Sequence, residues 1–136
     1  MSKAKYLEIG QSLSRLCYID KDDIRHMQRL AGYDTSGNDI SVLLSDAQKT
    51  NRHLQAPAAL LHALVDSSIS KLLDAPTAGR HQRTILDDIG NAYAGETVTV
   101  NVNASRIHRG WVTFDVEVVN EHGQKLVQGT VESPMP

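Results

Sequence analysis

Apolar and polar residues alternate along most of the last third of the chain. The alternation covers residues 97–103, 111–119 and 124–132, and turns that contain glycine separate these stretches. Period-two alternation of β-branched and aromatic residues is typical of antiparallel strands that bury one face. We therefore expect a β-meander over residues 94–132.

A second pattern, of helical period, runs from about Pro57 to Leu73 and is the longest in the chain. Proline suits the first turn of a helix, and no later residue in this stretch breaks one. The residues on one face are Ala58, Leu61, Leu64, Val65, Ser68, Ile69 and Leu72, and Ala59, Leu60 and Ala63 keep much of the rest apolar. A helix that is apolar nearly all round is buried on more than one side, so we expect a curved sheet to wrap it.

Shorter elements are predicted elsewhere. We expect strands around residues 13–19 and 84–89. Asp20 is a good N-cap for a short helix, and turn formers over residues 32–41 predict a loop before another short helix at 42–50. The apolar stripe of the first short helix would consist of Ile24, Met27, Leu30 and Ala31.

These elements together predict one α+β domain over residues 1–136, with an antiparallel sheet packed on one long helix. The free edges of such a sheet need covering, so we expect a homodimer.

Composition narrows the choice of function. The net charge is −2, which gives no electrostatic reason to expect nucleic-acid or membrane binding. No apolar run approaches the roughly 20 residues that span a bilayer. The first residues carry charge without an apolar stretch behind it, so we do not expect them to be a signal peptide. The single Cys17 excludes an internal disulfide and fits a reducing cytoplasm. The histidines lack the spacing of a metal site, so we expect a cytoplasmic protein without metal or cofactor.

Three short segments resemble one family in their order along the chain. They are YLEIG at 6–10, AGETV at 94–98 and NEHGQKLVQG at 120–129. Together they resemble the MaoC-like branch of the hot-dog superfamily, which includes (R)-specific enoyl-CoA hydratases. The resemblance covers nearly the whole chain. It implies a hot-dog fold, a curved antiparallel sheet around one long central helix, and an acyl thioester of coenzyme A or acyl carrier protein as substrate.

The resemblance also implies a hydratase or dehydratase site. In the family, an Asp and a His in a D-x-N-P-x-H loop before the long helix transfer protons. Asp34 matches this Asp, and Asp39 stands where the family has His. Asp34 would be the base, and Asp39 or His62 the second proton-transfer group. A histidine trades protons near neutral pH, whereas paired carboxylates do so only when the pKa of one of them is raised. Alternatively, Asp34 and Asp39 are turn residues whose side chains accept hydrogen bonds from nearby backbone N–H groups.

The start of the long helix has an implied role as well. Backbone N–H groups near Ala58 and Ala59 would stabilise the oxyanion. His53, just before the helix, would contact a coenzyme A phosphate or lie in a solvated loop.

Asp66 supports a different reaction. PaaI-type thioesterases carry an Asp one to two turns after H-G-G, a position occupied here by residues 57–59. Asp66 would then act as nucleophile or as general base for water. Alternatively, it is a polar residue where the helix meets a dimer interface or solvent. An ionised carboxylate on a mostly apolar helix is costly unless it is paired. His62 lies one turn before Asp66 and faces the same way, either as a catalytic dyad or as a structural hydrogen bond.

Asp87 and Asp88 complete the set of candidate carboxylates. Period two sends one of them to the buried face of the predicted strand, at a bulge, an edge or a subunit interface. Beyond the hydratase and thioesterase, two further functions stay open: a specialised isomerase or cyclase, and a non-catalytic subunit that binds an acyl chain or supports a partner.

Overall fold

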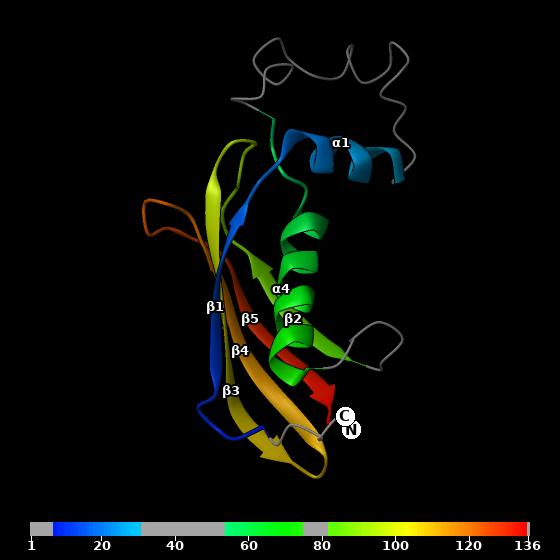
Figure 1. Cartoon of the computed structure of the whole chain (residues 1–136), viewed down its shortest axis with the longest axis vertical. Coiled ribbons are helices and arrows are strands. Elements are labelled where there is room, and N and C mark those ends of the chain that lie inside the picture. Colours follow the sequence, from blue (N-terminus) through cyan, green and yellow to red (C-terminus); the bar gives the residue numbers. More distant parts are fainter. Residues whose placement is uncertain (1–6, 31–53, 75–81, 136) are drawn as a thin grey trace.

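Five antiparallel strands curve around one central helix (Figure 1). The computed structural model describes residues 7–30, 54–74 and 82–135. The elements are β1 (Ser12–Tyr18), α1 (Lys21–Leu30), α4 (Ala58–Leu73), β2 (Arg83–Asp88), β3 (Thr97–His108), β4 (Trp111–Val119) and β5 (Lys125–Pro134). The strand order is β1-β3-β4-β5-β2, so β1 and β2 form the two edges.

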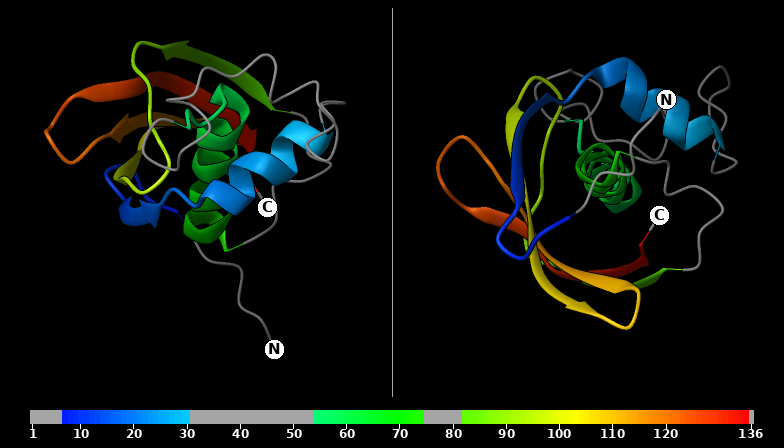
Figure 2. Two further views of the ribbon diagram at one scale, coloured as in Figure 1. Left: turned by 90° about the horizontal axis from the view of Figure 1, so that it is seen from above. Right: turned by 60° about the horizontal axis from the view of Figure 1, so that its bottom comes forward.

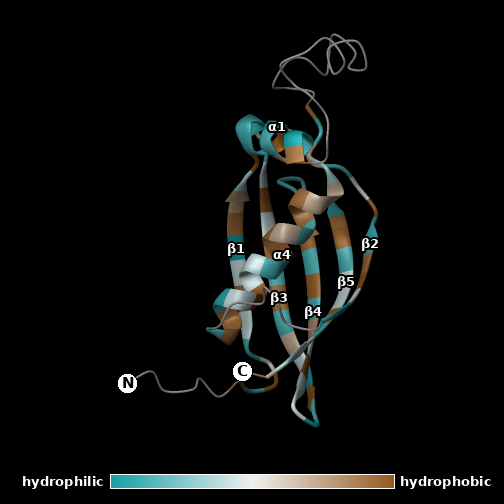
Figure 3. Ribbon diagram, turned by 90° about the vertical axis from the view of Figure 1, so that its right-hand side faces the viewer, coloured by the Kyte–Doolittle hydropathy of each residue, from teal (hydrophilic) through white to brown (hydrophobic). Residues whose placement is uncertain are grey.

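The core lies between the inner face of the sheet and α4. Alternate residues of β3 and β4 are buried, among them Val98, Val100, Val102, Ala104, Val112, Phe114, Val116 and Val118. They face the buried side of α4, which carries Leu61, Val65, Ile69 and Leu72. Figure 2 shows the sheet curling around α4, and Figure 3 shows apolar and polar residues alternating along the strands. Burying each such side chain contributes about 1.5–3 kcal/mol.

The α+β architecture, the meander and the central helix are therefore confirmed. Pro57 is the N-cap of α4, and its fixed φ of −65° suits that place. The meander extends further than predicted, because β3 continues to His108 and β5 to Pro134. The strands predicted around 13–19 and 84–89 are β1 and β2.

The expectation that α4 is buried nearly all round is wrong. Ala58, Ala59 and Ala63 are exposed, because the sheet of one chain covers only one side of α4.

In α1, the carboxylate of Asp20 accepts the N–H of Asp22 at 2.8 Å, as expected of an N-cap.

The apolar stripe predicted for α1 is buried only at its first residue, so that prediction is wrong for the later positions that the structure describes. Only Ile24 is buried, and Leu30 is 75% exposed. Helix α1 lies beyond the N-terminal end of α4 (Figure 1), so its later turns reach past the core. The predicted loop 32–41 and helix 42–50 lie outside the described residues, as does Ala31.

Candidate active site

Three candidate residues form one row along α4. Ala58, His62 and Asp66 are spaced by four residues, which places them on the same side of the helix. This side faces the edge strand β2, because the Nε2 atom of His62 lies 2.8 Å from the Oδ1 atom of Asp88. The contact of His62 with Asp88 thus brings together α4 and β2, which are separated in sequence.

The strand periodicity of β2 decides which of its two aspartates meets the helix. Asp88 shares a side with Leu86, which packs against the core, and it points toward α4. Asp87 points the opposite way and lines a groove on the outer face of the sheet. The two carboxylates point to opposite faces of the sheet, as period two predicts, but the expectation that one of them is buried is wrong, because β2 is an edge strand.

His62 is held by Asp88. A hydrogen bond joins the imidazole ring of His62 on α4 to the carboxylate of Asp88 on β2. The side chains of His62 and Asp88 are 35% and 44% exposed, respectively. Solvent and a ligand can therefore reach the pair. A histidine oriented by a carboxylate has a fixed ring position, which is a property of histidines that transfer protons.

Asp66 lies one turn further along α4 and is half-buried. Desolvation by burial raises the pKa of the Asp66 carboxyl above its usual value, while positive charge on His62 opposes this rise. A carboxyl group with a raised pKa is a better base when ionised and a more available acid near neutral pH.

The N-terminal end of α4 offers backbone donors. No side chain caps the helix at Pro57, and the first N–H groups of a helix have no acceptor within it. Ala58 and Ala59 are exposed there. Because the helix dipole also favours negative charge at this end, the amides of Ala58 and Ala59 can donate to an anionic oxygen on the side of the helix that carries His62.

The remaining candidates, Asp34, Asp39 and His53, lie outside the described residues. Within residues 7–30, 54–74 and 82–135, no three side chains of metal-binding type gather in one place. Over the same ranges, no helix is both long and apolar enough to cross a membrane.

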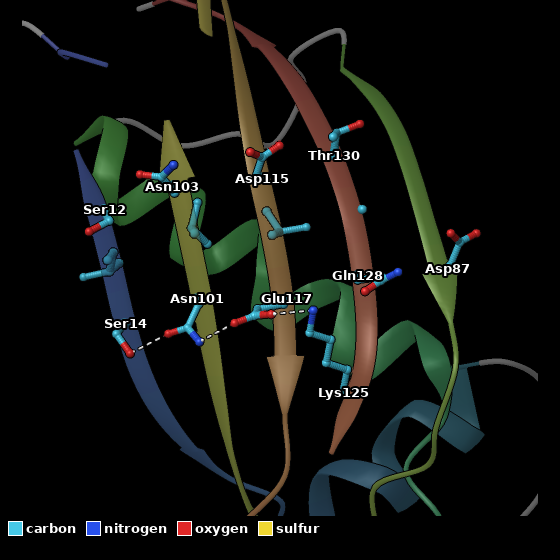
Figure 4. A pocket seen from close by; sticks show the side chains of 14 residues that line it. Ser12, Ser14, Asp87, Asn101, Asn103, Asp115, Glu117, Lys125, Gln128 and Thr130 are labelled. Carbon is cyan, nitrogen blue, oxygen red and sulfur yellow. Dashed lines mark hydrogen bonds and ion pairs between the residues drawn. The ribbon is translucent and has the colours of Figure 1, made fainter. Parts of the chain in front are cut away.

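A polar groove on the outer face of the sheet is separate from this row (Figure 4). It contains a chain of contacts across four strands. Ser14 Oγ donates to Asn101 at 2.6 Å, Asn101 donates to Glu117 at 3.1 Å, and Lys125 Nζ lies 3.7 Å from Glu117. No pattern in the sequence distinguishes these residues, because polar positions that alternate with a buried face usually contact only solvent.

Comparison with known proteins identifies the fold. No family model and no curated protein matches the chain. Among solved structures, the unliganded (R)-hydratase PhaJ1 from Pseudomonas aeruginosa is 23% identical, with a TM-score of 0.74 over 96% of this chain and 83% of that one. An (R)-hydratase from A. caviae involved in PHA biosynthesis is 18% identical, with a TM-score of 0.76 over 98% of this chain and 100% of that one.

A thioesterase has the same architecture. The fluoroacetyl-CoA thioesterase FlK is 10% identical, with a TM-score of 0.67 over 96% of this chain and 88% of that one. The chain therefore has the hot-dog fold, and its resemblance to the branch that contains the (R)-hydratases is supported at the level of the fold.

Proposed function

We propose that this protein is an enzyme that acts on an acyl thioester of coenzyme A or acyl carrier protein, and that it adds water to an enoyl thioester or removes it. The observation that carries the proposal is the contact of His62 with Asp88, about one turn from the N-terminal end of α4, where no side chain among the described residues caps the helix. It supplies a proton-transfer group beside donors for an oxyanion, on a fold shared with (R)-hydratases.

The helix end would bind the thioester carbonyl. When water adds to the β-carbon, the electrons of the carbon–carbon double bond move to the carbonyl oxygen, which becomes enolate-like. The N–H groups of Ala58 and Ala59 donate to that oxygen, and the helix dipole adds to the stabilisation. Removing one such donor typically costs about 100-fold or more in rate.

Two groups would move protons. Asp34 takes a proton from water as the water oxygen bonds to the β-carbon, and His62 gives a proton to the α-carbon as the enolate collapses. The product is a 3-hydroxyacyl thioester. Asp88 holds the His62 ring through Nε2, which leaves Nδ1 for the substrate. Asp39 remains the alternative to His62 in this role.

We also propose that two copies assemble through β2. This edge strand pairs with β5 on one side only. Ile85 within β2 is 71% exposed, and Ile89 directly after β2 is 53% exposed. An open edge with exposed apolar side chains is a template for another strand. A second copy at this edge would place the His62–Asp88 pair at the subunit boundary and would cover the bare side of α4.

The test is a crotonyl-CoA hydration assay run beside thiol release from a panel of acyl-CoAs. His62→Gln and Asp34→Asn should each lower the hydration kcat about 100-fold to 10,000-fold, because each removes a proton-transfer group. His122→Gln is the matched control, since His122 lies in an exposed turn of the β4–β5 hairpin. Hydration that persists in the His62 variant assigns the second proton transfer to Asp39, and hydration unaffected by both substitutions overturns the mechanism.

Thioester hydrolysis is the second candidate, favoured by the raised pKa of Asp66. In that reaction Asp66 takes a proton from water as the water oxygen bonds to the thioester carbonyl carbon, while the same amides at the α4 N-terminus hold the oxyanion. The carbon–sulfur bond then breaks, and Asp66 gives the proton to the leaving thiolate. Thiol release without hydration, abolished by Asp66→Asn and retained in Asp34→Asn, would establish this reaction instead.

A further inference from the structure

A basic groove lies on the outer face of the sheet, at the end formed by the β3–β4 hairpin. Its volume is about 450 Å³, and its lining residues are Arg83, Arg106, His108, Arg109, Trp111, Thr113 and Glu132. Three guanidinium groups face a single carboxylate there, although the chain as a whole has a net charge of −2. These seven residues form the basic groove.

A β-bulge places two of the basic side chains in the groove. Up to Ala104, the even-numbered residues of β3 are buried, and the register with β4 then shifts between Ala104 and Arg106. Beyond the shift, Arg106 pairs with Thr113 and His108 with Trp111. Unbroken alternation would turn Arg106 toward the core. The bulge reverses the alternation, which is how bulges redirect side chains next to functional sites.

The hairpin turn brings the third cation. Arg109 and Gly110 form a two-residue turn in which both have positive φ, 50° and 77°. Such turns favour Asn-Gly or Gly-Gly, because a residue with a large side chain is strained at positive φ. The stability of the turn therefore does not explain why an arginine, whose side chain lines the groove, occupies position 109.

Two of the three arginines are available to a ligand. Arg83 lies 3.6 Å from Glu132, and its guanidinium sits 5.2 Å from the centre of the Trp111 ring. Among the described residues, no carboxylate lies within salt-bridge distance of Arg106 or Arg109, and both are exposed. Their guanidinium groups can each donate a pair of parallel hydrogen bonds to an oxyanion.

We propose that the basic groove binds the phosphate groups of a small, multiply phosphorylated ligand of the nucleotide class. Its volume falls in the range of small-molecule sites. A protein partner would need roughly 800 Å² of surface, which would extend over the neighbouring polar groove with Asp87, Asp115 and Glu117 (Figure 4). Those carboxylates repel an acidic carrier protein. A free nucleotide and the phosphorylated adenosine end of coenzyme A share the required chemistry, and the inference does not depend on the proposed reaction.

The chain carries its own reporter for this site. Trp111 is the single tryptophan of the protein, so its fluorescence reports on the groove without background from elsewhere. We would titrate the full chain at low salt with tripolyphosphate, ATP and adenosine 3′,5′-bisphosphate. The expected result is a saturable change whose midpoint rises with salt, because salt screens exposed charges. Similar midpoints for all three indicate a general phosphate site, and tighter binding of the bisphosphate identifies coenzyme A as the source.

Two substitutions with opposite expected effects test the assignment. Arg109→Asn keeps a residue that tolerates positive φ and should weaken binding about fivefold, the size of an exposed charge pair. Glu132→Gln removes the competing carboxylate and should tighten binding. Lys125→Gln, in the neighbouring polar groove, is the control and should change nothing. No saturable response to any probe, or a response unaffected by Arg109→Asn, overturns the proposal, as does tight binding of an acyl carrier protein in place of all three probes.

Discussion

Each edge strand is joined to α4 through one of its polar side chains, and the two connections differ in chemistry. At the β1 edge, Nη1 of Arg15 donates to the hydroxyls of Ser67 and Ser68 at 2.7 and 3.2 Å. At the β2 edge, His62 meets Asp88 at 2.8 Å. Both contacts fix an edge strand to the same helix.

The difference lies in burial and in protonation. Ser68 is fully buried, and its own hydroxyl donates to the carbonyl of Leu64 at 2.8 Å. An arginine keeps its charge at any ordinary pH, so the β1 contact is constant and serves packing. The β2 contact is accessible to solvent, and its charge depends on a histidine. One fold thus holds a structural contact on one side of its helix and a titratable contact on the other.

The largest expected effect separates the two neighbouring aspartates of β2. Asp88→Asn should lower kcat at least about tenfold with little change in KM, because His62 loses the carboxylate that orients its ring. Asp87→Asn is a matched control on the next residue, facing the outer groove. Steady-state kinetics of both variants make the comparison. Equal losses in the two variants would show that Asp88 acts only through the stability of the strand.

The β1 contact should respond in stability alone. Arg15→Met removes the hydrogen bonds to Ser67 and Ser68 and should lower the free energy of unfolding by roughly 1–2 kcal/mol. Activity per folded molecule should stay unchanged. Denaturant unfolding and kinetics measure the two quantities, with Arg25→Met on α1 as control. A fall in kcat comparable to that of Asp88→Asn would mean that the two edges are not distinct in role.

The smallest effect concerns Asp66 and pH. Because burial raises the pKa of Asp66 in the folded state, the folded protein binds more protons than the unfolded chain between the usual and the raised pKa. Stability therefore falls as pH rises through that window. Asp66→Asn removes this penalty, so its melting temperature should rise relative to the wild type as pH increases, and the difference should vanish below the usual aspartate range.

Thermal unfolding of both proteins across acidic and neutral pH gives the measurement. Asp115→Asn on the outer face controls for the loss of one negative charge. A difference that shrinks with rising pH would mean that Asp66 is stabilised in its ionised form, contrary to the direction given by burial.

Local patterns in the sequence were enough for the elements and their order. The apolar repeat that follows Pro57 predicts α4, and alternating β-branched residues predict β3, β4 and β5, because periodicity and turn residues act over a few neighbours. The same argument separated Asp87 from Asp88. It failed on the burial of α4 and α1, since the number of sides that become covered depends on what packs there.

The candidate site was only partly predictable. The sequence placed His62 and Asp66 on one side of a helix, because their spacing of four residues is a local property. It did not identify Asp88 as the partner of His62, since 26 residues separate them and only the position of β2 at the sheet edge brings them together. Asp34, Asp39 and His53 stay predictions.

By itself, then, the sequence determined which segments are helix or strand and which residues alternate between two faces. Tertiary structure alone decided which of those faces meets α4, which carboxylate reaches His62, and where the alternation of β3 reverses. The two kinds of feature differ in how far apart along the chain the interacting residues lie. Backbone preference and side-chain periodicity act between neighbours in the chain, whereas the partner of a side chain and the register of a bulge depend on strand pairing between distant segments.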